Sequence, residues 1–553
     1  MNENAANAPR LRIPFAPACG ALVAVWLSLG PSLLPRPALL QALACILAAA
    51  LGYAVGALTG WVLRGIGVHL EGRTRRIAWI VFAVIAAAGT IAAFTFHLSW
   101  QRTMRNEIGV DGLTFSHIPI IFVVSLLGAA AVLAIARLLR AAGRFTGRQV
   151  ARVLPGPVAV VLGAVLVGMA TWWVVDTMVT SRILNRMDTT FIAINDEFRA
   201  DLAPPTSPHV SGGPDSSVAW DDLGRYGRLF VINAPTPESI SQFTGQPALE
   251  PVRAYAGIGP DGESDLAQQA DIAVRELELM GGFDRAVLNV VTSTGRGWVN
   301  DNQVRALEYM WNGDTATVSI QYSYLPSWVS FLVDGERAQT AGRLLFDAVY
   351  EHWRELPEDA RPLLVVSGES LGTFGAEAAF GGVHDLSERT DGALFVGPTG
   401  DNTLWSQFTA ERDPGSPEVL PILQDGKTVR FSHGTDWDRP DPHWSQPRVG
   451  YIQHSDDPVT WWTWSLFTHK PDWLKEPRGE AVSPHMRWIP FITGLQVGLD
   501  QFVGQDVPAG YGHEFGTAPI YGWARILPPP GWSDADADRL ADAVSSAPLH
   551  DDE

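Results

Sequence analysis

The chain has 553 residues, which is enough for more than one domain, and its 40 Lys+Arg and 59 Asp+Glu give a formal net charge of −19. Residues 1–180 hold 14 Arg, no Lys and 5 acidic residues, so the rest of the chain carries all of the negative excess. Such an acidic region argues against nucleic-acid binding, which needs basic grooves. The negative charge of this region favours solubility. The alternative explanation is a cationic or zwitterionic substrate.

The first 180 residues contain five long apolar stretches. A helix needs ~20 consecutive apolar residues to cross the hydrocarbon core of a bilayer. The first stretch is too long for the core of a signal peptide and lacks a small-residue cleavage site. We therefore expect a domain of about five transmembrane helices over residues 1–180, followed by a linker over 181–225. The stretches are residues 13–34, 38–63, 77–98, 118–136 and 157–180.

Arginine counts near these stretches predict the orientation. The side of the N-terminus holds 11 Arg and the other side holds 5, and basic residues favour the cytoplasmic side. The N-terminus should then be cytoplasmic and residues 181–553 extracytoplasmic. In the second stretch Gly52, Gly56 and Gly60 form a small-residue stripe that lets helices approach closely. We expect packing within the bundle, with a homo-oligomer contact as the alternative.

After residue 225, strand-like and helix-like segments alternate. This order predicts an α/β fold with a mostly parallel, doubly wound sheet, whose site lies at the carboxyl ends of the strands. We expect a catalytic domain over 226–532, a cap over the site from 398–446, and an acidic tail over 533–553 that is disordered at its end. The expected strands are Arg228–Asn233, Ala286–Thr292, Thr315–Tyr322, Pro362–Ser367, Gly392–Val396 and Arg448–His454, and the expected helices lie near 264–280, 301–311, 337–355 and 371–381.

One strand-to-helix junction carries the motif G-x-S-x-G, in Gly368-Glu369-Ser370-Leu371-Gly372. A sharp turn between a strand and a helix brings backbone close to backbone, and glycine tolerates this best. The turn exposes the Ser370 hydroxyl at a helix N-terminus, where the dipole favours developing negative charge. We therefore predict that Ser370 is a nucleophile; the alternative is an ordinary glycine-rich turn.

A serine nucleophile needs a histidine base and a carboxylate that orients it. Asp456 and Asp457 end the last expected strand, and Pro458 favours Asp457 because it restricts the preceding residue. Asp456 remains the alternative. His513, in a glycine-rich loop, is the best-placed base, although 488–503 before it reads as an apolar helix. The other downstream histidines that stay open are His384, His433, His443, His454, His469, His485 and His550.

The oxyanion formed by such a reaction needs backbone N–H donors. We expect these from Leu371 and from the loop that follows the Ala286–Thr292 strand, at Thr294 and Gly295. The alternative for this loop is an ordinary turn. No pattern indicates a metal, nucleotide or haem, so no cofactor is expected.

Together these segments resemble a family of bacterial membrane-anchored α/β-hydrolases with an N-terminal multi-span domain. In that family's Gly-His-Gly-His loop Tyr511 replaces the first histidine, which leaves His513 as the base, and the family's Asp-Pro step falls on Asp457. Some relatives look like hydrolases of aminoacylated phospholipids, so the resemblance implies a cationic membrane substrate. The matching segments are Gly30–Arg36, Thr294–Trp298, Gly368–Gly372, Gln453–Pro458 and Gly510–His513.

The expected function is a membrane-bound serine ester hydrolase that acts on a lipid of the bacterial cell membrane, with the bilayer as its partner. An acyltransferase to lipid or cell-envelope acceptors would use the same residues. A non-catalytic transport or assembly subunit is the alternative of another class. The tryptophans that follow the acid line either a mouth facing the membrane or the core; they are Trp461, Trp462, Trp464 and Trp473.

Overall fold

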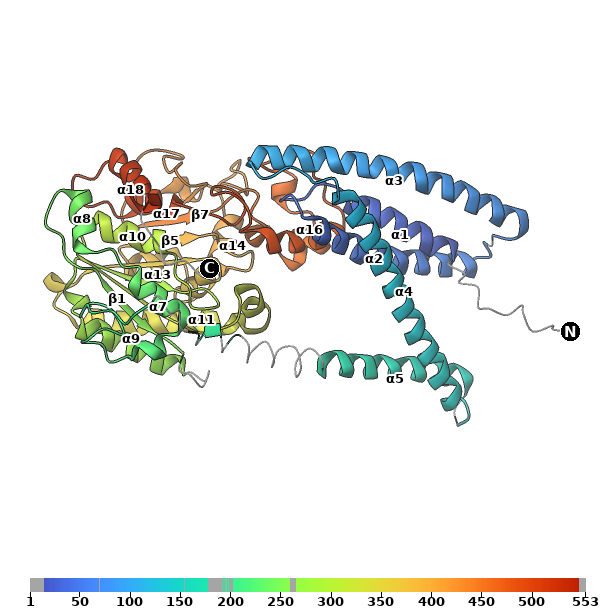
Figure 1. Ribbon diagram of the computed structural model, residues 1–553, viewed down its shortest axis with the longest axis horizontal. Coiled ribbons are helices and arrows are strands. Elements are labelled where there is room, and N and C mark those ends of the chain that lie inside the picture. The colour runs from blue at the N-terminus through green and yellow to red at the C-terminus, as the bar shows by residue number, and fades with distance from the viewer. Residues whose placement is uncertain are drawn as a thin grey trace. The chain divides into compact units, whose positions relative to one another are not determined.

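The computed structural model describes residues 14–68, 70–153, 155–177, 202–258 and 265–546, together with 191, 194–195 and 197 (Figure 1). The chain divides into two compact units. The helical unit comprises Met1–Thr177 and Thr463–Asp506, and the sheet unit comprises Met178–Trp462 and Val507–Glu553.

Among the described residues of the helical unit, three helices are long and apolar enough to cross a membrane, namely α2, α3 and α4. The helix α1 has 14 residues, about 21 Å at ~1.5 Å per residue, which is less than the hydrocarbon thickness of ~30 Å. It ends where the loop 29–37 begins, because the prolines at 31, 35 and 37 of that loop do not continue a helix. For α5, a helix of 21 residues, the apolar run among the described residues is Val161–Val174. Over the residues that the structure describes, the predicted count of five spans is therefore corrected to three, beside two shorter apolar runs. The elements are α1 (Phe15–Ser28), α2 (Ala38–Gly65), α3 (Gly72–Ile108), α4 (His117–Val150), α5 (Gly156–Asp176), η6 (Trp464–Phe467), η7 (Asp472–Leu474), α16 (Ile492–Asp500) and η8 (Gln501–Val503).

The predicted glycine stripe packs α2 against α1. A Cβ atom added at Gly52 would lie 2.2 Å from the carbonyl oxygen of Gly20, and one added at Gly56 would lie 2.4 Å from that of Ala16. Only residues without a side chain allow so close an approach of two helices. The stripe is a packing surface inside this hairpin, the first of the two uses expected for it.

The sheet unit contains a seven-stranded sheet in the order β1-β3-β2-β4-β5-β7-β6, and every pairing in it is parallel. The helices α9, α11 and α12 pack together on one set of strands, while α10, α17 and α18 form a separate layer. Nearly every strand residue is buried, as in a sheet covered on both faces. The predicted doubly wound parallel sheet is confirmed. The strands are β1 (Val252–Ala256), β2 (Val287–Thr292), β3 (Thr315–Ile320), β4 (Leu363–Glu369), β5 (Gly392–Val396), β6 (Val429–Ser432) and β7 (Arg448–Ile452).

The remaining elements of the sheet unit are helices of varied length. The expected helices near 264–280, 301–311, 337–355 and 371–381 correspond to α9, α10, α11 and α12. The elements are η2 (Trp220–Leu223), α7 (Gly224–Ile232), α8 (Pro237–Thr244), α9 (Leu266–Leu279), η3 (Gly282–Asp284), α10 (Asp301–Met310), α11 (Ser327–Glu355), η4 (Glu358–Ala360), α12 (Leu371–Glu377), α13 (Val383–Arg389), α14 (Thr403–Ala410), η5 (Gln424–Gly426), α15 (Pro458–Trp461), α17 (Ala518–Ile526) and α18 (Asp534–Ser546).

One predicted strand is wrong and two strands were missed. Residues 228–232 belong to helix α7, because a short apolar run has no periodicity that separates a buried strand from a buried helix. The strand β1 was missed because it contains Arg253. This arginine is fully buried but paired, with its Nε 2.7 Å from Oε1 of Glu308. The missed edge strand β6 likewise contains a buried arginine, Arg430.

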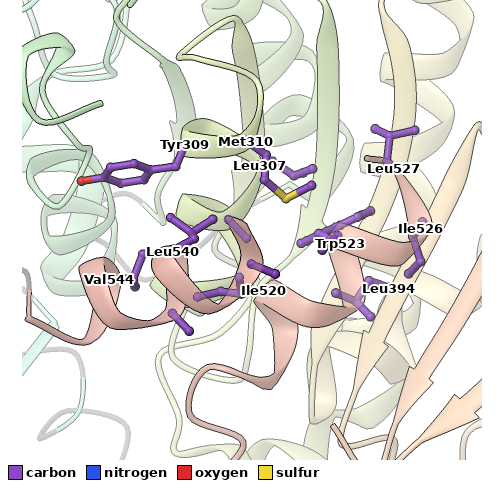
Figure 2. Packing of buried hydrophobic residues seen from close by; sticks show 14 of the residues in the cluster. Leu307, Tyr309, Met310, Leu394, Ile520, Trp523, Ile526, Leu527, Leu540 and Val544 are labelled. Carbon is purple, nitrogen blue, oxygen red and sulfur yellow. The ribbon is translucent and has the colours of Figure 1, made fainter. Parts of the chain in front are cut away.

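The structure also differs from the expected domain boundaries. The helix α18 occupies most of the expected tail, and its Ala537, Leu540, Ala541 and Val544 are buried. Their helical spacing gives α18 one apolar face, which packs with α10 and α17 in a single core (Figure 2). Residues 547–553 of the expected tail and 181–190 of the expected linker lie outside the described residues.

The segment expected to form a cap is partly a component of the sheet. Its residues 429–432 form the edge strand β6, and Trp437 and Trp444 are buried in the core cluster. Residues 463–506, expected within the catalytic domain, group with the helical unit.

Candidate active site

Ser370 occupies a tight turn between β4 and α12. Its φ of 54° and ψ of −123° are unusual for a residue with a side chain, and such strained backbone concentrates at functional sites. A Cβ atom at Gly368 would lie 2.6 Å from the carbonyl group of Gly372, and one at Gly372 would lie 2.3 Å from the Thr292 oxygen. Both motif glycines are therefore sterically required. The Ser370 amide donates to the Val396 carbonyl, 2.8 Å away, at the end of β5.

Asp457 and His513 form a buried pair although 56 residues separate them in the chain. The His513 Nδ1 atom lies 2.7 Å from Asp457 Oδ2, and the side chains are 4% and 0% exposed. The Asp457 carboxylate is held from both sides. Its Oδ1 accepts from the Val459 amide at 2.8 Å. Its Oδ2 lies 3.0 Å from the Thr460 hydroxyl, whose hydrogen is shared with the Pro398 carbonyl at 2.7 Å. This carboxylate can therefore fix the orientation of the imidazole.

The His513 ring lies at the same strand end as Ser370. A Cβ atom at Gly397, the residue after β5, would lie 2.7 Å from Cε1 of His513. The Ser370 amide is bonded to the preceding residue, Val396. Among the described residues, the other ring nitrogen, Nε2, is buried and has no hydrogen-bond partner. That atom is the one that would accept a proton from a serine hydroxyl.

The charges around His513 favour its protonated form. Burial by itself lowers its pKa, but the charge and hydrogen bond of Asp457 outweigh it. The charges of Glu369 and Glu514 act in the same direction, so the net pKa is raised. A histidine held in this way binds a proton more readily during a reaction.

Sequence reasoning missed Glu369, the residue before Ser370. Burial raises the pKa of this carboxyl to about 7, against the charge of His513 and a hydrogen bond from Asn300, which lower it. Asn300 donates from Nδ2 to Glu369 Oε2, and its own Oδ1 accepts from the Gln303 amide at the start of α10. Glu369 thus joins the serine turn to the loop that precedes α10. The sequence feature that could have identified Glu369 is its carboxylate at the end of an otherwise mostly apolar strand.

The expected oxyanion loop lies beside the serine turn, because a Cβ at Gly372 would meet both Thr292 and Ser293 oxygens. The Thr294 amide is already used, since it donates to the Trp298 carbonyl at 2.9 Å. The amides of Leu371 and Gly295 therefore remain as candidate donors to the oxyanion.

The other residues singled out from the sequence have varied surroundings. Asp456 is buried, and burial raises its pKa to about 7 although the Gly512 amide bonds to it. His454 Nδ1 lies 2.9 Å from the Gly512 carbonyl, so both residues support the loop that carries His513. Trp461 is buried and Trp464 is exposed. Within the described ranges no group of three or more His, Cys, Asp or Glu side chains is arranged to hold a metal ion.

Comparison with known proteins places the whole architecture in one family. Residues 29–235 match the model described as the alpha/beta-hydrolase family N-terminus, and residues 252–540 match the model of the alpha/beta-hydrolase family itself. No curated protein and no solved structure matches the chain. The second match covers more than half of the sequence, and the parallel sheet with its serine turn agrees with it. The chain therefore belongs to the alpha/beta-hydrolase family.

Proposed function

We propose that this protein is a membrane-bound serine ester hydrolase with Ser370 as nucleophile, His513 as base and Asp457 as the orienting acid. The observation that carries the proposal is the buried His513–Asp457 pair, whose free Nε2 lies at the strand end that also holds the Ser370 turn. Family membership supports hydrolysis in general, and these three residues support acyl transfer through a serine. The ester bond is part of the proposal.

The proposed reaction has two halves. The Ser370 oxygen attacks the ester carbonyl while His513 Nε2 takes its proton, and the amides of Leu371 and Gly295 stabilise the oxyanion. The imidazolium then returns the proton to the leaving alcohol, which leaves an acyl-enzyme. Water, activated by the same nitrogen, cleaves that ester and releases the acid.

The proposed substrate is a membrane lipid ester, and aminoacyl-phosphatidylglycerol is the first compound to test. Two observations support this class. Three helices are able to cross a bilayer, and attachment raises the effective concentration of a membrane substrate. The acidic region after residue 180 suits a substrate with a free ammonium group. We further propose a bacterial cell membrane location with the sheet unit on the extracytoplasmic side.

The direct test compares the full-length protein with its Ser370→Ala variant. We expect hydrolysis of aminoacyl-phosphatidylglycerol by the parent and a loss of about 10⁴-fold or more in the variant, because no other group replaces the nucleophile. Released amino acid is the measurement, and a fluorophosphonate probe should label only the parent. Cleavage of plain phospholipid alone would support the proposed hydrolase activity and contradict the proposed aminoacyl substrate. Transfer to an added alcohol without hydrolysis would identify an acyltransferase, and no labelling would leave a non-catalytic subunit.

A second prediction concerns the dependence of activity on pH. The base works only when His513 is neutral, so kcat/KM should fall as the pH drops through its raised pKa. Glu369→Gln removes a charge that raises this pKa. The imidazole then stays neutral to lower pH, and the acidic limb of the profile should move to lower pH. The measurement is the profile of kcat/KM for a soluble ester.

Glu514→Gln is the matched control for this prediction, because Glu514 acts on His513 in the same direction but less strongly than Glu369. Its acidic limb should move less. An unchanged profile in Glu369→Gln, with activity retained, would show that Glu369 does not act on the base.

A further inference from the structure

Residues 463–506, here called the inserted segment, separate Asp457 from His513 in the chain, yet they group with the helical unit. Within that unit α16 packs against α1 and α2. Its Ile492 is buried in a cluster with Ala24 of α1 and Ala48 of α2, and Ile489 and Leu51 pack against the same cluster. Part of the chain between the acid and the base therefore lies among the apolar helices.

The neighbours of Ile492 mark its depth along these helices. Ala48 lies about 15 Å from the start of α2 at ~1.5 Å per residue. Ala24 lies one half-turn before Trp26, whose indole nitrogen donates to the Thr90 hydroxyl of α3 at 3.1 Å. Thr90 is inside the apolar run 77–96 of α3. Ala48 thus places the start of α16 level with the interior of the apolar stretch of α2, and Ala24 places it four residues before the end of α1.

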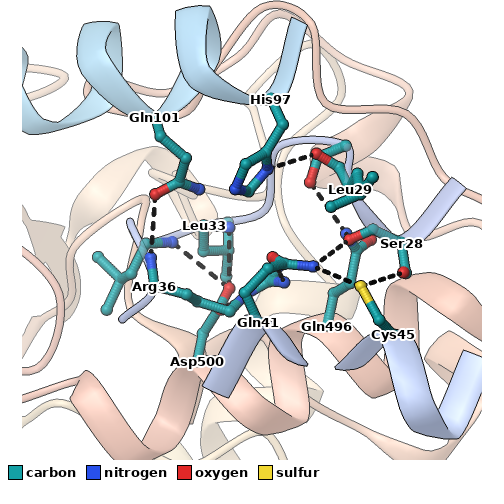
Figure 3. A network of polar contacts seen from close by, with 12 residues as sticks. Ser28, Leu29, Leu33, Arg36, Gln41, Cys45, His97, Gln101, Gln496 and Asp500 are labelled. Atoms are coloured by element: carbon teal, nitrogen blue, oxygen red, sulfur yellow. Dashed lines mark hydrogen bonds and ion pairs between the residues drawn. The ribbon is translucent and has the colours of Figure 1, made fainter. Parts of the chain in front are cut away.

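The other end of α16 is polar and lies at the loop 29–37 (Figure 3). Asp500 Oδ1 accepts from Arg36 Nε at 2.6 Å, and its Oδ2 accepts from the Leu33 amide at 3.1 Å. One turn earlier, Gln496 donates to the carbonyls of Ser28 and Gly30 at 3.1 and 3.0 Å. The helix is therefore polar where it meets the loop and apolar where it lies deepest.

Several hydrogen-bond donors at the deep end of α16 have partners within the protein. The Ile489 amide donates to the Thr493 hydroxyl at 2.7 Å, and the Phe491 amide donates to the Phe467 carbonyl at 2.8 Å. The Trp488 indole donates to the Leu466 carbonyl at 3.0 Å. Irregular backbone is tolerated inside a bilayer only when its polar groups have such partners.

Aromatic side chains at this deep end face outward. Trp464 is 68% exposed and Phe491 is 46% exposed. Phe467 lies between them, with ring centroids 5.8 Å from Trp464 and 6.4 Å from Phe491. We call these three residues the aromatic tip. An exposed apolar cluster at membrane depth is suited to contact with lipid chains.

We propose that one part of the inserted segment is a re-entrant membrane element, in which α16 enters the hydrocarbon core beside α1 and α2 and the aromatic tip contacts lipid acyl chains. The exposed Asp472–Lys475 pair of the same segment stays in water. The inference rests on the proposed membrane location of α2 and α3, and it is independent of the proposed triad. It deepens the proposed function, because the segment that connects Asp457 to His513 in the chain then turns within the lipid. The substrate class is then a lipid taken from the bilayer and not an ester dissolved in water.

Depth can be measured on the full-length protein in phosphatidylglycerol–phosphatidylcholine vesicles. With Cys19 and Cys45 replaced by Ala, a nitroxide is attached at Phe491→Cys or, as the matched control, at Leu279→Cys in the sheet unit. Leu279 has a similar exposure of 51%. We expect oxygen, which concentrates in lipid, to relax the label at 491 more than a water-soluble nickel chelate does, and the reverse at 279. Equal access of the chelate to both labels would overturn the proposal.

A second comparison uses rates, with Phe491→Asp beside Leu279→Asp. A charge in the hydrocarbon core is strongly unfavourable, so the rate on vesicle lipid relative to a short soluble ester should fall roughly tenfold for Phe491→Asp. The ratio should not change for Leu279→Asp, and an unchanged ratio in both would contradict the proposal. If the parent shows no Ser370-dependent labelling, the proposed hydrolase fails while the depth measurement still decides this inference.

Discussion

Asp457→Asn is expected to reduce kcat by about 10⁴-fold without unfolding the sheet unit. The Val459 amide donates to Oδ1 of Asp457, so the amide oxygen of an asparagine would take that position. Its NH₂ group would then face His513 Nδ1 in place of the present acceptor, Oδ2. That contact stabilises the tautomer with hydrogen on Nε2, which cannot accept the proton of Ser370. The measurement is kcat on a soluble ester.

Asp456→Asn is the matched control for this prediction. Asp456 is the neighbouring buried carboxyl, but its partner is the Gly512 amide and not the His513 ring. We expect a much smaller loss of kcat from this change. If Asp456→Asn proves as damaging as Asp457→Asn, or if Asp457→Asn remains active, the acid is assigned wrongly.

Asp500→Asn is expected to destabilise the helical unit by about 3–5 kcal/mol, the usual cost of leaving a buried charge without its partner. Arg36 and Asp500 are 1% and 0% exposed, so water cannot replace the lost carboxylate. The asparagine can still accept from the Leu33 amide, which confines the change mainly to the charge. The measurement is the midpoint of thermal unfolding of the full-length protein in detergent, with its yield from membranes.

Asp472→Asn in the same inserted segment provides the control. Asp472 pairs with Lys475 at 2.8 Å, but the two side chains are 45% and 55% exposed, and such surface pairs contribute about 0–1 kcal/mol. We also expect Arg36→Met combined with Asp500→Leu to be more stable than Asp500→Asn alone, because it removes both charges. Equal midpoints for Asp500→Asn and Asp472→Asn would show that the buried pair does not hold the segment.

Features that depend on local chain geometry could be predicted from the sequence. The serine turn is an example, because Gly368 and Gly372 are required by contacts within a few residues and at one neighbouring strand. The strands β2, β3, β4, β5 and β7 were also predictable, since continuous apolar runs bounded by turn residues are typical of a buried parallel sheet. The step Asp457-Pro458 likewise restricts its own backbone.

Features that depend on distant partners could not be predicted in the same way. The charged Arg253 made the sequence of β1 unlike that of a buried strand. The partner that allows its burial, Glu308, lies 55 residues away in the chain. The acidic composition of residues 533–546 obscured the apolar face of α18. That face is buried only because α10 and α17 pack against it. The oxyanion role of the loop at Thr294 and Gly295 stays a prediction, and the bond from the Thr294 amide to Trp298 depends on how that loop closes.

The sequence by itself therefore determined the family, the parallel sheet, the apolar N-terminal helices and the serine turn. Each of these features follows from residue periodicity, from short motifs or from short-range steric requirements. Only the tertiary structure decided that His513 meets Asp457, that Glu369 joins the serine turn to the Asn300 loop, and that α16 packs among α1 and α2. Each of these contacts joins residues far apart in the chain, and packing alone, not local propensity, selects which buried charges and apolar faces come together.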